Sequence, residues 1–380
     1  MKISCAQLEH DGTLALITAL QSKGHLALFV GGCVRNAILG EPIVDIDITT
    51  DARPEVVTRV ASDANFKVVP TGIDHGTVTV VAGGLAHEVT TLRKDVQTDG
   101  RRAVVEYSSS VAEDAARRDF TMNALYLQTD GTVLDPLGGL PDLLARRVRF
   151  VGDAQRRITE DYLRILRFFR FYALYGDPTL GIDPDGLAAC AAQIAGIETL
   201  SRERVGAEMR KLLSAPDPAP ALAAMDQAGV LAQVLPGASA RAMPILVHLE
   251  SGSPRGWLGR LAVIGGQNAG GLLRLSRAET NTHDNILAGI GSGFAPAVLG
   301  WMHGATVAGD IVHARGALFE TDLPFDWQSE ANRGAVAIFP VSAADLMPAV
   351  QGLALGTRLR ELQERWLASG LTLTREQLLA

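Results

Sequence analysis

Residues 28–51 read LFVGGCVRNAILGEPIVDIDITTD, and this stretch decides the fold. Its first three residues are apolar and predict a strand. Gly31 and Gly32 follow directly and predict a turn that no side chain obstructs. Residues 33–39 then predict a short helix, which ends at a glycine where a left-handed residue is needed. The N–H groups at the start of such a helix attract phosphate.

A second strand is expected over residues 43–49, and it carries two carboxylates, Asp45 and Asp47. Residues two apart in a strand point to the same face, so we expect these two acids to project together. Adjacent acids repel one another unless a cation lies between them, and oxygen ligands at a phosphate site suit Mg²⁺. Two such ions are a common device for in-line phosphoryl transfer. Two chance acids at a solvated strand end are the alternative.

The composition describes a globular protein with an acidic balance. The chain has 380 residues, of which 47% are hydrophobic, enough for several domains with a substantial core. The sequence lacks an apolar run long enough for a membrane span, and its first residues lack the apolar core of a signal peptide. Three cysteines without metal-type spacing predict free thiols in a reducing cytoplasm. The net charge of −7 confines any RNA contact to a local basic surface.

The segment GGCVRNAILGEPIVDIDITT, residues 31–50, resembles the signature of the class II tRNA nucleotidyltransferases and bacterial poly(A) polymerases. That family belongs to the DNA polymerase β-like nucleotidyltransferases, and its usual pattern is GGxVRD, whose last residue is Asn36 here. The resemblance implies an α+β fold: a polymerase β-like head, a mixed sheet with helices, followed by an all-α neck, body and tail. The expected domains are the catalytic head at 1–139, the helical neck at 140–213, and the helical body and tail, which would hold tRNA, at 214–380.

A second stretch, ARRDFTMNALYL at residues 116–127, resembles the family's RRDFTxNA motif. The resemblance implies that Arg117 and Arg118 meet the triphosphate. It also implies that Asp119 accepts a hydrogen bond from the ribose hydroxyls and that Asn123 braces the site. Without the resemblance, the same residues describe an ion-paired helix end. The nucleotide-binding residues that it adds from the first motif are Gly31, Gly32 and Arg35.

Three further strands are expected over residues 66–69, 77–81 and 86–92. The last of them contains Glu88. Polymerase β-like folds usually place a third carboxylate beside the metal pair, and the resemblance implies that Glu88 is this third metal ligand. Plain surface exposure of Glu88 is the alternative.

Residues 93–109 are polar and charged, and they predict a mobile loop. The family has a flexible loop here that resembles RxD…DGRR and is associated with switching from C addition to A addition. A solvated loop without a role is the alternative. The residues that would form the switching loop are Arg93, Asp95, Arg101 and Arg102.

Residues 159–175, TEDYLRILRFFRFYALY, predict a helix with Thr159 as its N-cap. Asp161 and Arg164 are three apart and are expected on one helical face, and they resemble the family's EDxxR base-reading motif. A carboxylate beside a guanidinium complements the amino group of cytosine or adenine, whereas uracil and guanine place a carbonyl there. Helix capping alone is the alternative role of Asp161. Arg167, one turn further on, is expected to contact the nucleotide as well.

The resemblance implies a CCA-adding tRNA nucleotidyltransferase, which extends the 3′ end of tRNA with CTP and ATP, without a template, and releases pyrophosphate. Two Mg²⁺ ions on Asp45 and Asp47 would be its cofactors. The expected partners are the tRNA acceptor end, CTP and ATP, with no membrane or protein partner implied, in the cytoplasm. The alternatives are an enzyme that adds only A or only CC, a poly(A) polymerase, and a catalytically silent RNA-binding protein. The presence of both acids counts against the silent protein, because binding alone needs no metal ligands.

Overall fold

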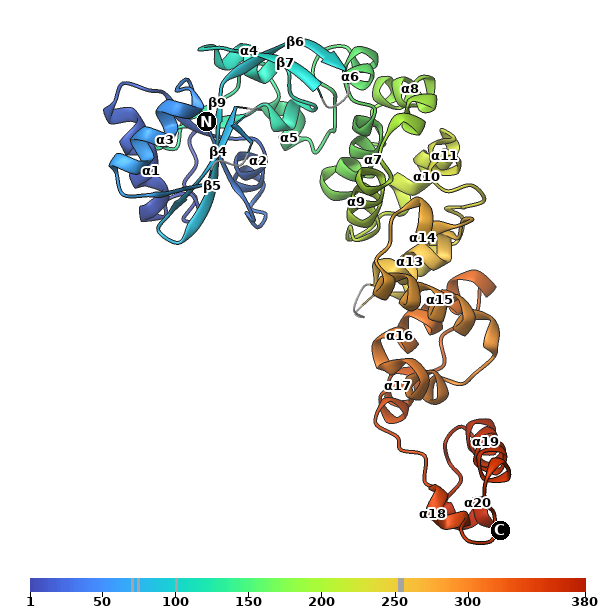
Figure 1. Cartoon of the computed structure of the whole chain (residues 1–380). Helices are drawn as coiled ribbons and strands as arrows, with labels where there is room; N and C mark the ends of the chain where they lie inside the picture. Colours follow the sequence, from blue (N-terminus) through green and yellow to red (C-terminus); the bar gives the residue numbers. More distant parts are fainter. Residues whose placement is uncertain (70–71, 74–75, 100–101, 252–255) are drawn as a thin grey trace. The chain divides into compact units, whose positions relative to one another are not determined.

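A computed structural model of the chain describes residues 1–69, 72–73, 76–99, 102–251 and 256–380 (Figure 1). It divides into two compact units. The first unit holds Met1–Ser201 with Gln227–Val230, and the second holds Arg202–Asp226 with Leu231–Ala380. Every strand in the described part of the chain lies in the first unit. The expected α+β fold, a mixed sheet with helices followed by a helical part, is therefore confirmed.

The first unit is built on a seven-stranded sheet with the order β3-β4-β5-β2-β1-β8-β9. The sheet is mixed, because β2 and β5 run parallel while the other neighbours run antiparallel. All four residues of β1 are buried, which places this strand in the core. The strands are β1 (Ala27–Val30), β2 (Ile46–Thr50), β3 (Lys67–Val69), β4 (Thr77–Ala82), β5 (Leu85–Thr91), β8 (Tyr126–Leu127) and β9 (Val133–Leu134).

The strand expected over 43–49 begins later than predicted, at Ile46, so Asp45 precedes β2 rather than lying within it. Ile46 and Ile48 are buried, as the alternation of the strand requires. The residues before them are exposed, and Val44 has 88% of its surface accessible. Residues this exposed would bury no side-chain surface by pairing in the sheet, so the strand begins only at Ile46.

Helices contact the sheet and connect its strands. In α1, the buried residues Leu16, Ile17 and Leu20 form one apolar stripe. The helices of the first unit lie before, between and after the strands along the chain. They are α1 (Asp11–Ser22), α2 (Gly32–Leu39), α3 (Pro54–Asp63), α4 (Val111–Ala116), α5 (Leu140–Leu144), α6 (Ala154–Glu160), α7 (Leu163–Tyr175) and α8 (Pro184–Ala192), with short 3₁₀ turns at Thr121–Asn123 and Ile194–Thr199.

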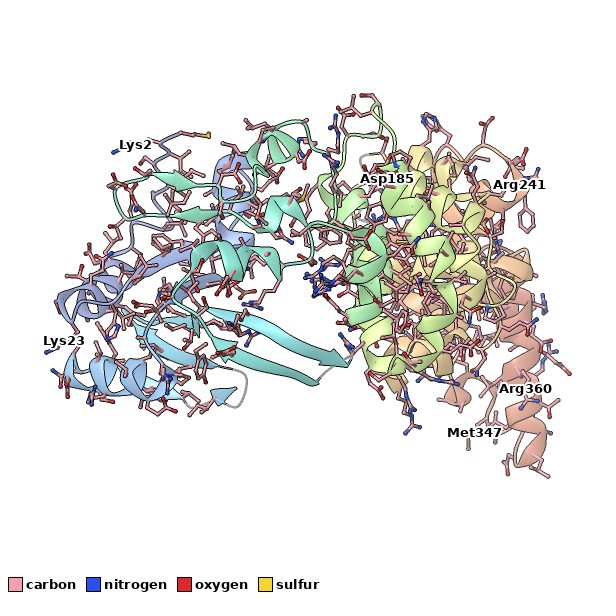
Figure 2. The ribbon with its side chains drawn as sticks, turned by 90° about the horizontal axis from the view of Figure 1, so that it is seen from above. Lys2, Lys23, Asp185, Arg241, Met347 and Arg360 are labelled. Atoms are coloured by element: carbon pink, nitrogen blue, oxygen red, sulfur yellow. The ribbon has the colours of Figure 1, made fainter. Side chains whose placement is uncertain are left out.

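The β8–β9 hairpin turns at Asp130 and Gly131, as the sequence predicts, and Gly131 has a φ of 81°. A side chain there would lie only 2.2 Å from the carbonyl oxygen of Ile3. The start of the chain is joined to this hairpin, because Lys2 bridges Thr132 and its Nζ lies 2.8 Å from Asp130 Oδ2 (Figure 2). The first residues therefore extend the edge of the sheet.

The mobile loop expected over 93–109 is instead a two-stranded antiparallel ribbon, β6 (Arg93–Asp99) and β7 (Arg102–Tyr107). Its pairing runs from Arg93 opposite Tyr107 to Asp99 opposite Arg102, with one irregularity between Asp95 and Gln97. The sequence prediction counted the charges and missed the β-branched residues among them, which favour strands. Arg101 lies outside the described residues, and so do the side chains of Asp95 and Arg102.

The single helix expected over 159–175 is broken into α6 and α7. Asp161 has an extended backbone, with φ −155° and ψ 105°, and its Oδ1 accepts a hydrogen bond from the Leu163 N–H. Thr159 is not an N-cap, since it lies inside α6 and its hydroxyl donates to the Arg156 carbonyl. Aspartate side chains compete with the helix for backbone N–H groups, which explains the break at this residue.

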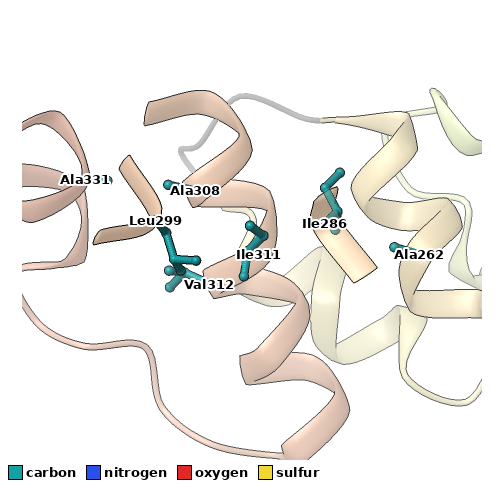
Figure 3. Packing of buried hydrophobic residues seen from close by; sticks show 7 residues of the cluster. All are labelled: Ala262, Ile286, Leu299, Ala308, Ile311, Val312 and Ala331. Carbon is teal, nitrogen blue, oxygen red and sulfur yellow. The ribbon is translucent and has the colours of Figure 1, made fainter. Parts of the chain in front are cut away.

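From Arg202 onward the described chain is helical. One core cluster of the second unit joins α13, α15, α16 and α17 through small and branched side chains, including Leu299, Ile311 and Ala331 (Figure 3). No helix among the described residues is both long and apolar enough to cross a membrane. The helices are α9 (Arg202–Leu213), α10 (Ala219–Gln227), α11 (Val230–Val234), α12 (Met243–Leu249), α13 (Trp257–Ile264), α14 (Ala269–Leu272), α15 (Arg277–Ser292), α16 (Pro296–Phe319), α17 (Trp327–Ala335), α18 (Ala343–Leu346), α19 (Leu353–Ala368) and α20 (Arg375–Leu379).

Candidate active site

The glycine turn after β1 has the geometry that the sequence predicts. Gly31 has φ 72° and ψ −124°, a conformation that other residues rarely adopt. A Cβ on Gly31 would lie 3.2 Å from Nη1 of Arg118, so this guanidinium lies against the turn. Helix α2 begins at Gly32 and ends before Gly40, which has a left-handed φ of 71°. The free N–H groups of α2 therefore lie beside a cation, a combination that suits an anion.

Two of the carboxylates that the sequence singles out, Asp47 and Glu88, lie on neighbouring strands, and Asp45 directly precedes the first of these strands. Asp47 in β2 is the parallel partner of Glu88 in β5, so the two side chains share a face of the sheet. Burial, followed by the charge of Glu88 and to a smaller degree that of Asp45, raises the pKa of Asp47 to about 6, while Arg118 lowers it. Among the described residues, however, no three His, Cys, Asp or Glu side chains form a ready cluster for a metal ion. Asp45, Asp47 and Glu88 therefore concentrate negative charge near the start of β2, but in the described part of the chain they do not form a preformed three-ligand metal site.

A cavity of about 220 Å³ opens beside these acids. Its lining includes Asp45 and Asp47 together with Gly32, Arg35 and Tyr175. The glycine turn, the start of α2 and the two predicted metal ligands thus line one space. Sequence reasoning predicted all of these residues except Tyr175.

Asp114 is the most completely buried carboxylate near the turn, and sequence reasoning missed it. Its Oδ1 lies 2.7 Å from Nη2 of Arg117, and its Oδ2 accepts hydrogen bonds from Arg118 at 2.9 Å and from the Tyr126 hydroxyl at 2.7 Å. Burial alone would raise the pKa of Asp114, but Arg118 and Arg117 hold it below its usual range. Arginines three and four residues after an aspartate in one helix were the available sequence signal.

The two arginines expected at the triphosphate are therefore held in place by one carboxylate. Their side chains keep only 16% and 18% of their surface exposed, for Arg117 and Arg118 respectively. Burial alone would lower the pKa of Arg118, but Asp114 raises it above its usual range, so this guanidinium stays charged. Arg118 also contacts the face of the Tyr126 ring, at 5.4 Å from the ring centroid. The geometry presents a fixed positive charge at the glycine turn.

Asp119 joins the RRDFTxNA-like motif to helix α7. Its Oδ1 accepts hydrogen bonds from the Phe120 N–H and from Asn123 Nδ2, both at 2.9 Å. Its Oδ2 accepts from Arg167 Nε at 2.8 Å and from Arg167 Nη2. Burial alone would raise the pKa of Asp119, but Arg167 and these hydrogen bonds hold it at about 2. The structure thus brings together three predicted site residues, Asp119, Asn123 and Arg167.

Arg35 continues this network toward the cavity. Its Nη1 donates to Asn123 Oδ1 at 2.5 Å, its Nη2 donates to the Tyr175 hydroxyl at 2.8 Å, and its guanidinium lies 4.0 Å from the centroid of the Tyr175 ring. Asn36, which replaces the family aspartate, accepts from Arg35 Nε at 3.0 Å and from Nη2 at 2.9 Å. The amide nitrogen of Asn36 donates to the Pro42 carbonyl at 2.6 Å, a bond that a carboxylate could not make.

The base-reading pair is arranged differently from the sequence prediction. Arg164 Nη1 donates to Glu160 Oε2 and to the Arg157 carbonyl, both at 2.6 Å, so the carboxylate beside this guanidinium is Glu160. Asp161 lies at the junction of α6 and α7 and caps the start of α7. The premise that one continuous helix places Asp161 and Arg164 on a common face is therefore wrong. Glu160 is the first residue of the same five-residue EDxxR motif, but the sequence prediction paired Arg164 with Asp161 instead.

Comparison with known proteins gives two family matches. Residues 27–149 match the family described as the poly A polymerase head domain. Residues 180–241 match one described as a probable RNA and SrmB-binding site of polymerase A.

Curated relatives match about half of the chain. The CCA tRNA nucleotidyltransferase 1, mitochondrial, of Homo sapiens is 40% identical over 204 residues, which is 53% of this chain and 47% of the human protein. A CCA-adding enzyme of Oceanobacillus iheyensis is 44% identical over 199 residues, 52% of this chain and 48% of the relative. The chain thus spans about half the length of the curated relatives it matches.

Solved structures extend the likeness to nearly the whole chain. The CCA-adding enzyme of Bacillus stearothermophilus, solved in complex with CTP, superposes with a TM-score of 0.75 and 27% identity over 96% of this chain and 94% of that one. The Thermotoga maritima CCA-adding enzyme complexed with tRNA superposes with a TM-score of 0.68 at 18% identity, covers 99% of this chain and 95% of its own, and supports the fold alone. Residues 27–149, which hold the glycine turn, the paired acids and the RRDFTxNA-like motif, match the poly A polymerase head-domain family, and the chain is similar to CCA-adding enzymes.

Proposed function

We propose that this protein adds C, C and A to the 3′ end of tRNA, taking the nucleotides from CTP and ATP without a template and releasing pyrophosphate. The observation that carries the proposal is the common lining of one cavity by the glycine turn and by Asp45 and Asp47. Residues 27–149 match the poly A polymerase head domain, and curated relatives of the chain include a CCA tRNA nucleotidyltransferase and a CCA-adding enzyme. The B. stearothermophilus enzyme, which binds CTP, supports a nucleoside triphosphate as the ligand.

The donor set of the cavity fits divalent metal ions. Asp45 and Asp47 supply hard oxygen ligands. Burial first, and then the negative charge of Glu88, raise the pKa of Asp47, and a cation would offset that charge. We propose that these two acids hold two Mg²⁺ ions, with Glu88 as a third carboxylate close by. When bound, the metal would supply Lewis-acid stabilisation of the transferring phosphoryl group and of the attacking 3′ oxygen.

The triphosphate is proposed to lie along the glycine turn. The α2 N-terminus offers N–H groups there, and Arg118 offers a positive charge that Asp114 keeps in place. Arg117, bound to the same carboxylate, would complete the electrostatic cradle. Such preorganised donors need no reorganisation when charge develops on the phosphates.

Asp119 is proposed to select ribose, as the resemblance implies, but its geometry adds a second role. Its two oxygens already accept four hydrogen bonds from Phe120, Asn123 and Arg167. A carboxylate has about four lone-pair sites, so a ribose hydroxyl must share or displace one of these donors. We infer that Asp119 also positions Asn123, and through it Arg35, at the cavity.

The choice of base is proposed to reside in Asp161 and Arg164. Arg164 is held rigidly by Glu160 and by the Arg157 carbonyl, which suits a donor that must discriminate among bases. Asp161 caps α7 through Oδ1, and its resemblance to the acid of the EDxxR motif supports a role in accepting the amino group of cytosine or adenine. Uracil and guanine would place a carbonyl oxygen against it.

The test uses three tRNA substrates, ending before, within and after CC, each incubated with one labelled nucleoside triphosphate at a time. The proposal requires C on the first two substrates, A on the third, and no extension of tRNA that already ends in CCA. Addition of A alone, or of CC alone, would assign a partial enzyme. Long A tails on unrelated RNA would assign a poly(A) polymerase, and no addition at all would favour the silent RNA-binding protein.

A further inference from the structure

A second cavity, of about 140 Å³, lies in the second unit between α16 and α17. Its rim is polar and exposed, formed by Thr306, Gln328 and Asn332, and its interior is formed by Asp310, His313 and Trp327 beside small residues. All of these residues belong to the second unit, whereas the nucleotide site proposed above belongs to the first. The cavity is therefore a separate feature of the fold.

The packing of the two helices explains why the cavity exists. A Cβ on Gly300 would lie 2.1 Å from the carbonyl oxygen of Ala331, and one on Gly334 would lie 1.8 Å from that of Ala297, so the first part of α16 touches the backbone of α17. Gly304 then departs from helical geometry, with φ 80° and ψ 161°. The kink redirects the second part of α16. The backbone of α16 therefore contacts α17 closely before the kink at Gly304 and leaves a cavity after it.

His313 lines the cavity and carries a buried hydrogen-bond acceptor without a partner in the described part of the chain. Its Nδ1 lies 2.7 Å from the Gly309 carbonyl oxygen, so Nδ1 carries the proton and donates. In the neutral ring Nε2 is then an acceptor. This nitrogen is closed to solvent and has no hydrogen-bond partner among the residues that the structure describes. Buried polar atoms are nearly always bonded, so an unpartnered one calls for an explanation.

Asp310 adds a second acceptor one helical turn earlier. Its carboxylate is packed against the start of α13, where a Cβ on Gly256 would come within 2.6 Å of it. Burial, followed by the neighbouring carboxylate of Glu250, raises the pKa of Asp310 to about 6, while Arg260 lowers it. A carboxylate in this environment gains from a ligand that donates hydrogen bonds to it.

Trp327 supplies the aromatic surface. Its ring lies edge-on to His313, with the ring centroids 4.8 Å apart, and it packs against the core cluster of Figure 3, which contains Ala308 and Ile311. The side chain is only partly buried, so one part of the ring remains available beside the cavity. An aromatic wall, acceptors inside and amide groups at the rim are the features of a site for a flat polar ring.

We infer that this cavity binds one planar, amino-bearing heteroaromatic ring, the chemistry shared by unpaired cytosine and adenine bases. The ring would lie against Trp327, donate its amino group to Asp310, and meet the amides of Gln328 and Asn332 at the rim. The size agrees with this assignment, since a cavity of about 150 Å³ in another protein holds a benzene ring. Uracil has a carbonyl in place of the amino group and is excluded by the same carboxylate.

The tryptophans of the chain make a clean assay possible. All four lie in the second unit: Trp257, Trp301, Trp327 and Trp366. Quenching of tryptophan fluorescence therefore reports a ring bound next to a tryptophan of the second unit, and the variants below assign it to the cavity beside Trp327. We expect cytidine and adenosine to quench saturably in the full-length chain, and uridine to bind at least about tenfold more weakly, equivalent to about 1.4 kcal/mol.

Two variants locate the ligand. Asp310→Asn should abolish the preference for cytidine over uridine, while Asp326→Asn, which alters an exposed acid next to Trp327 outside the cavity lining, should retain it. Asn332→Ala, an exposed rim change, should weaken cytidine binding without unfolding the unit. Equal quenching by uridine, or an unchanged preference in Asp310→Asn, would overturn the inference.

A second binding experiment shows whether the bound ring belongs to RNA or to a free nucleoside. Binding of a short oligocytidylate together with cytidine would assign an unpaired RNA base as the ligand, and binding of cytidine alone would assign a free nucleoside. Nucleotide addition by the head is measured separately, so loss of activity and loss of this site give different results.

Discussion

Replacing Asp114 by alanine tests whether one buried carboxylate holds the positive side of the nucleotide site in place. In Asp114→Ala, the guanidiniums of Arg117 and Arg118 and the hydroxyl of Tyr126 lose their common acceptor. Removing one partner of a buried ion pair typically costs about 3–5 kcal/mol, because the other charge is left buried and unpaired. We expect the free energy of unfolding of the first unit to fall by that amount, and nucleotide addition to be lost with it.

The sequence allows the two units to be followed separately. All the tryptophans lie in the second unit, whereas the five tyrosines lie in the first. Urea unfolding is therefore followed by tyrosine near-ultraviolet dichroism for the first unit and by tryptophan fluorescence for the second. Asp114→Ala should shift the tyrosine transition to lower urea and leave the tryptophan transition in place.

The matched control is Glu41→Ala, which removes an exposed ion pair with Arg146 at 3.7 Å. Exposed pairs contribute about 0–1 kcal/mol, so this variant should unfold nearly like the wild type. A loss below about 1 kcal/mol in Asp114→Ala would refute the reasoning, since the buried pair would then behave as an exposed one.

The same carboxylate makes a prediction about acid unfolding. Burial alone would raise the pKa of Asp114, but Arg118 and Arg117 hold it below its usual range. Its stabilisation is therefore present above the unfolded-state pKa of about 3.9 and is lost as the pH falls through the lower folded-state pKa. Between these two pKa values, the stability of the first unit should fall less steeply with decreasing pH in Asp114→Ala than in the wild type.

Three further substitutions test individual contacts of the site. Asn36→Ala removes both the Arg35 acceptor and the Pro42 bond and should raise the KM for CTP and ATP about tenfold, because Arg35 lines the proposed nucleotide cavity. Asn36→Asp loses only the Pro42 bond, and its KM should lie between those of Asn36→Ala and the wild type. Asp161→Ala should raise UTP and GTP incorporation relative to CTP and ATP by roughly tenfold or more, measured as kcat/KM for all four nucleotides, and a purely capping role would cost about 1 kcal/mol of stability with unchanged preference. Replacing residues 96–104 with Asn-Gly places the turn between the paired residues Asp95 and Val105, so the β6–β7 ribbon is shortened in register. This change should slow A addition more than C addition, whereas equal losses would argue against a switching role.

Sequence reasoning placed the head well because its signals are local. The Gly31-Gly32 turn, the helix that ends at Gly40 and the alternation of Ile46 and Ile48 each depend on residues a few positions apart. These patterns follow from backbone geometry, which does not need knowledge of the rest of the fold.

The remaining site features depend on contacts between residues far apart in the sequence, or on side chains that compete with the helix for backbone N–H groups. Tyr175 meets Arg35 across 140 positions, and no local pattern marks that contact. The break at Asp161 arises because a side chain competes with the helix for an N–H group, which the apolar periodicity of the segment does not reveal. Asp114 could have been predicted, since its arginine partners are three and four residues further along the chain, but the sequence analysis did not use this spacing.

The most direct measurement of the central claim is nucleotide addition by Asp47→Ala, with Asp63→Ala as an exposed acidic control from the same head. The substrate is tRNA that ends in CC, with ATP and Mg²⁺, and binding of the tRNA is measured in parallel. The account predicts that Asp47→Ala binds the tRNA and adds no A, while Asp63→Ala retains wild-type addition. Wild-type turnover by Asp47→Ala would contradict the assignment of catalysis to this carboxylate pair.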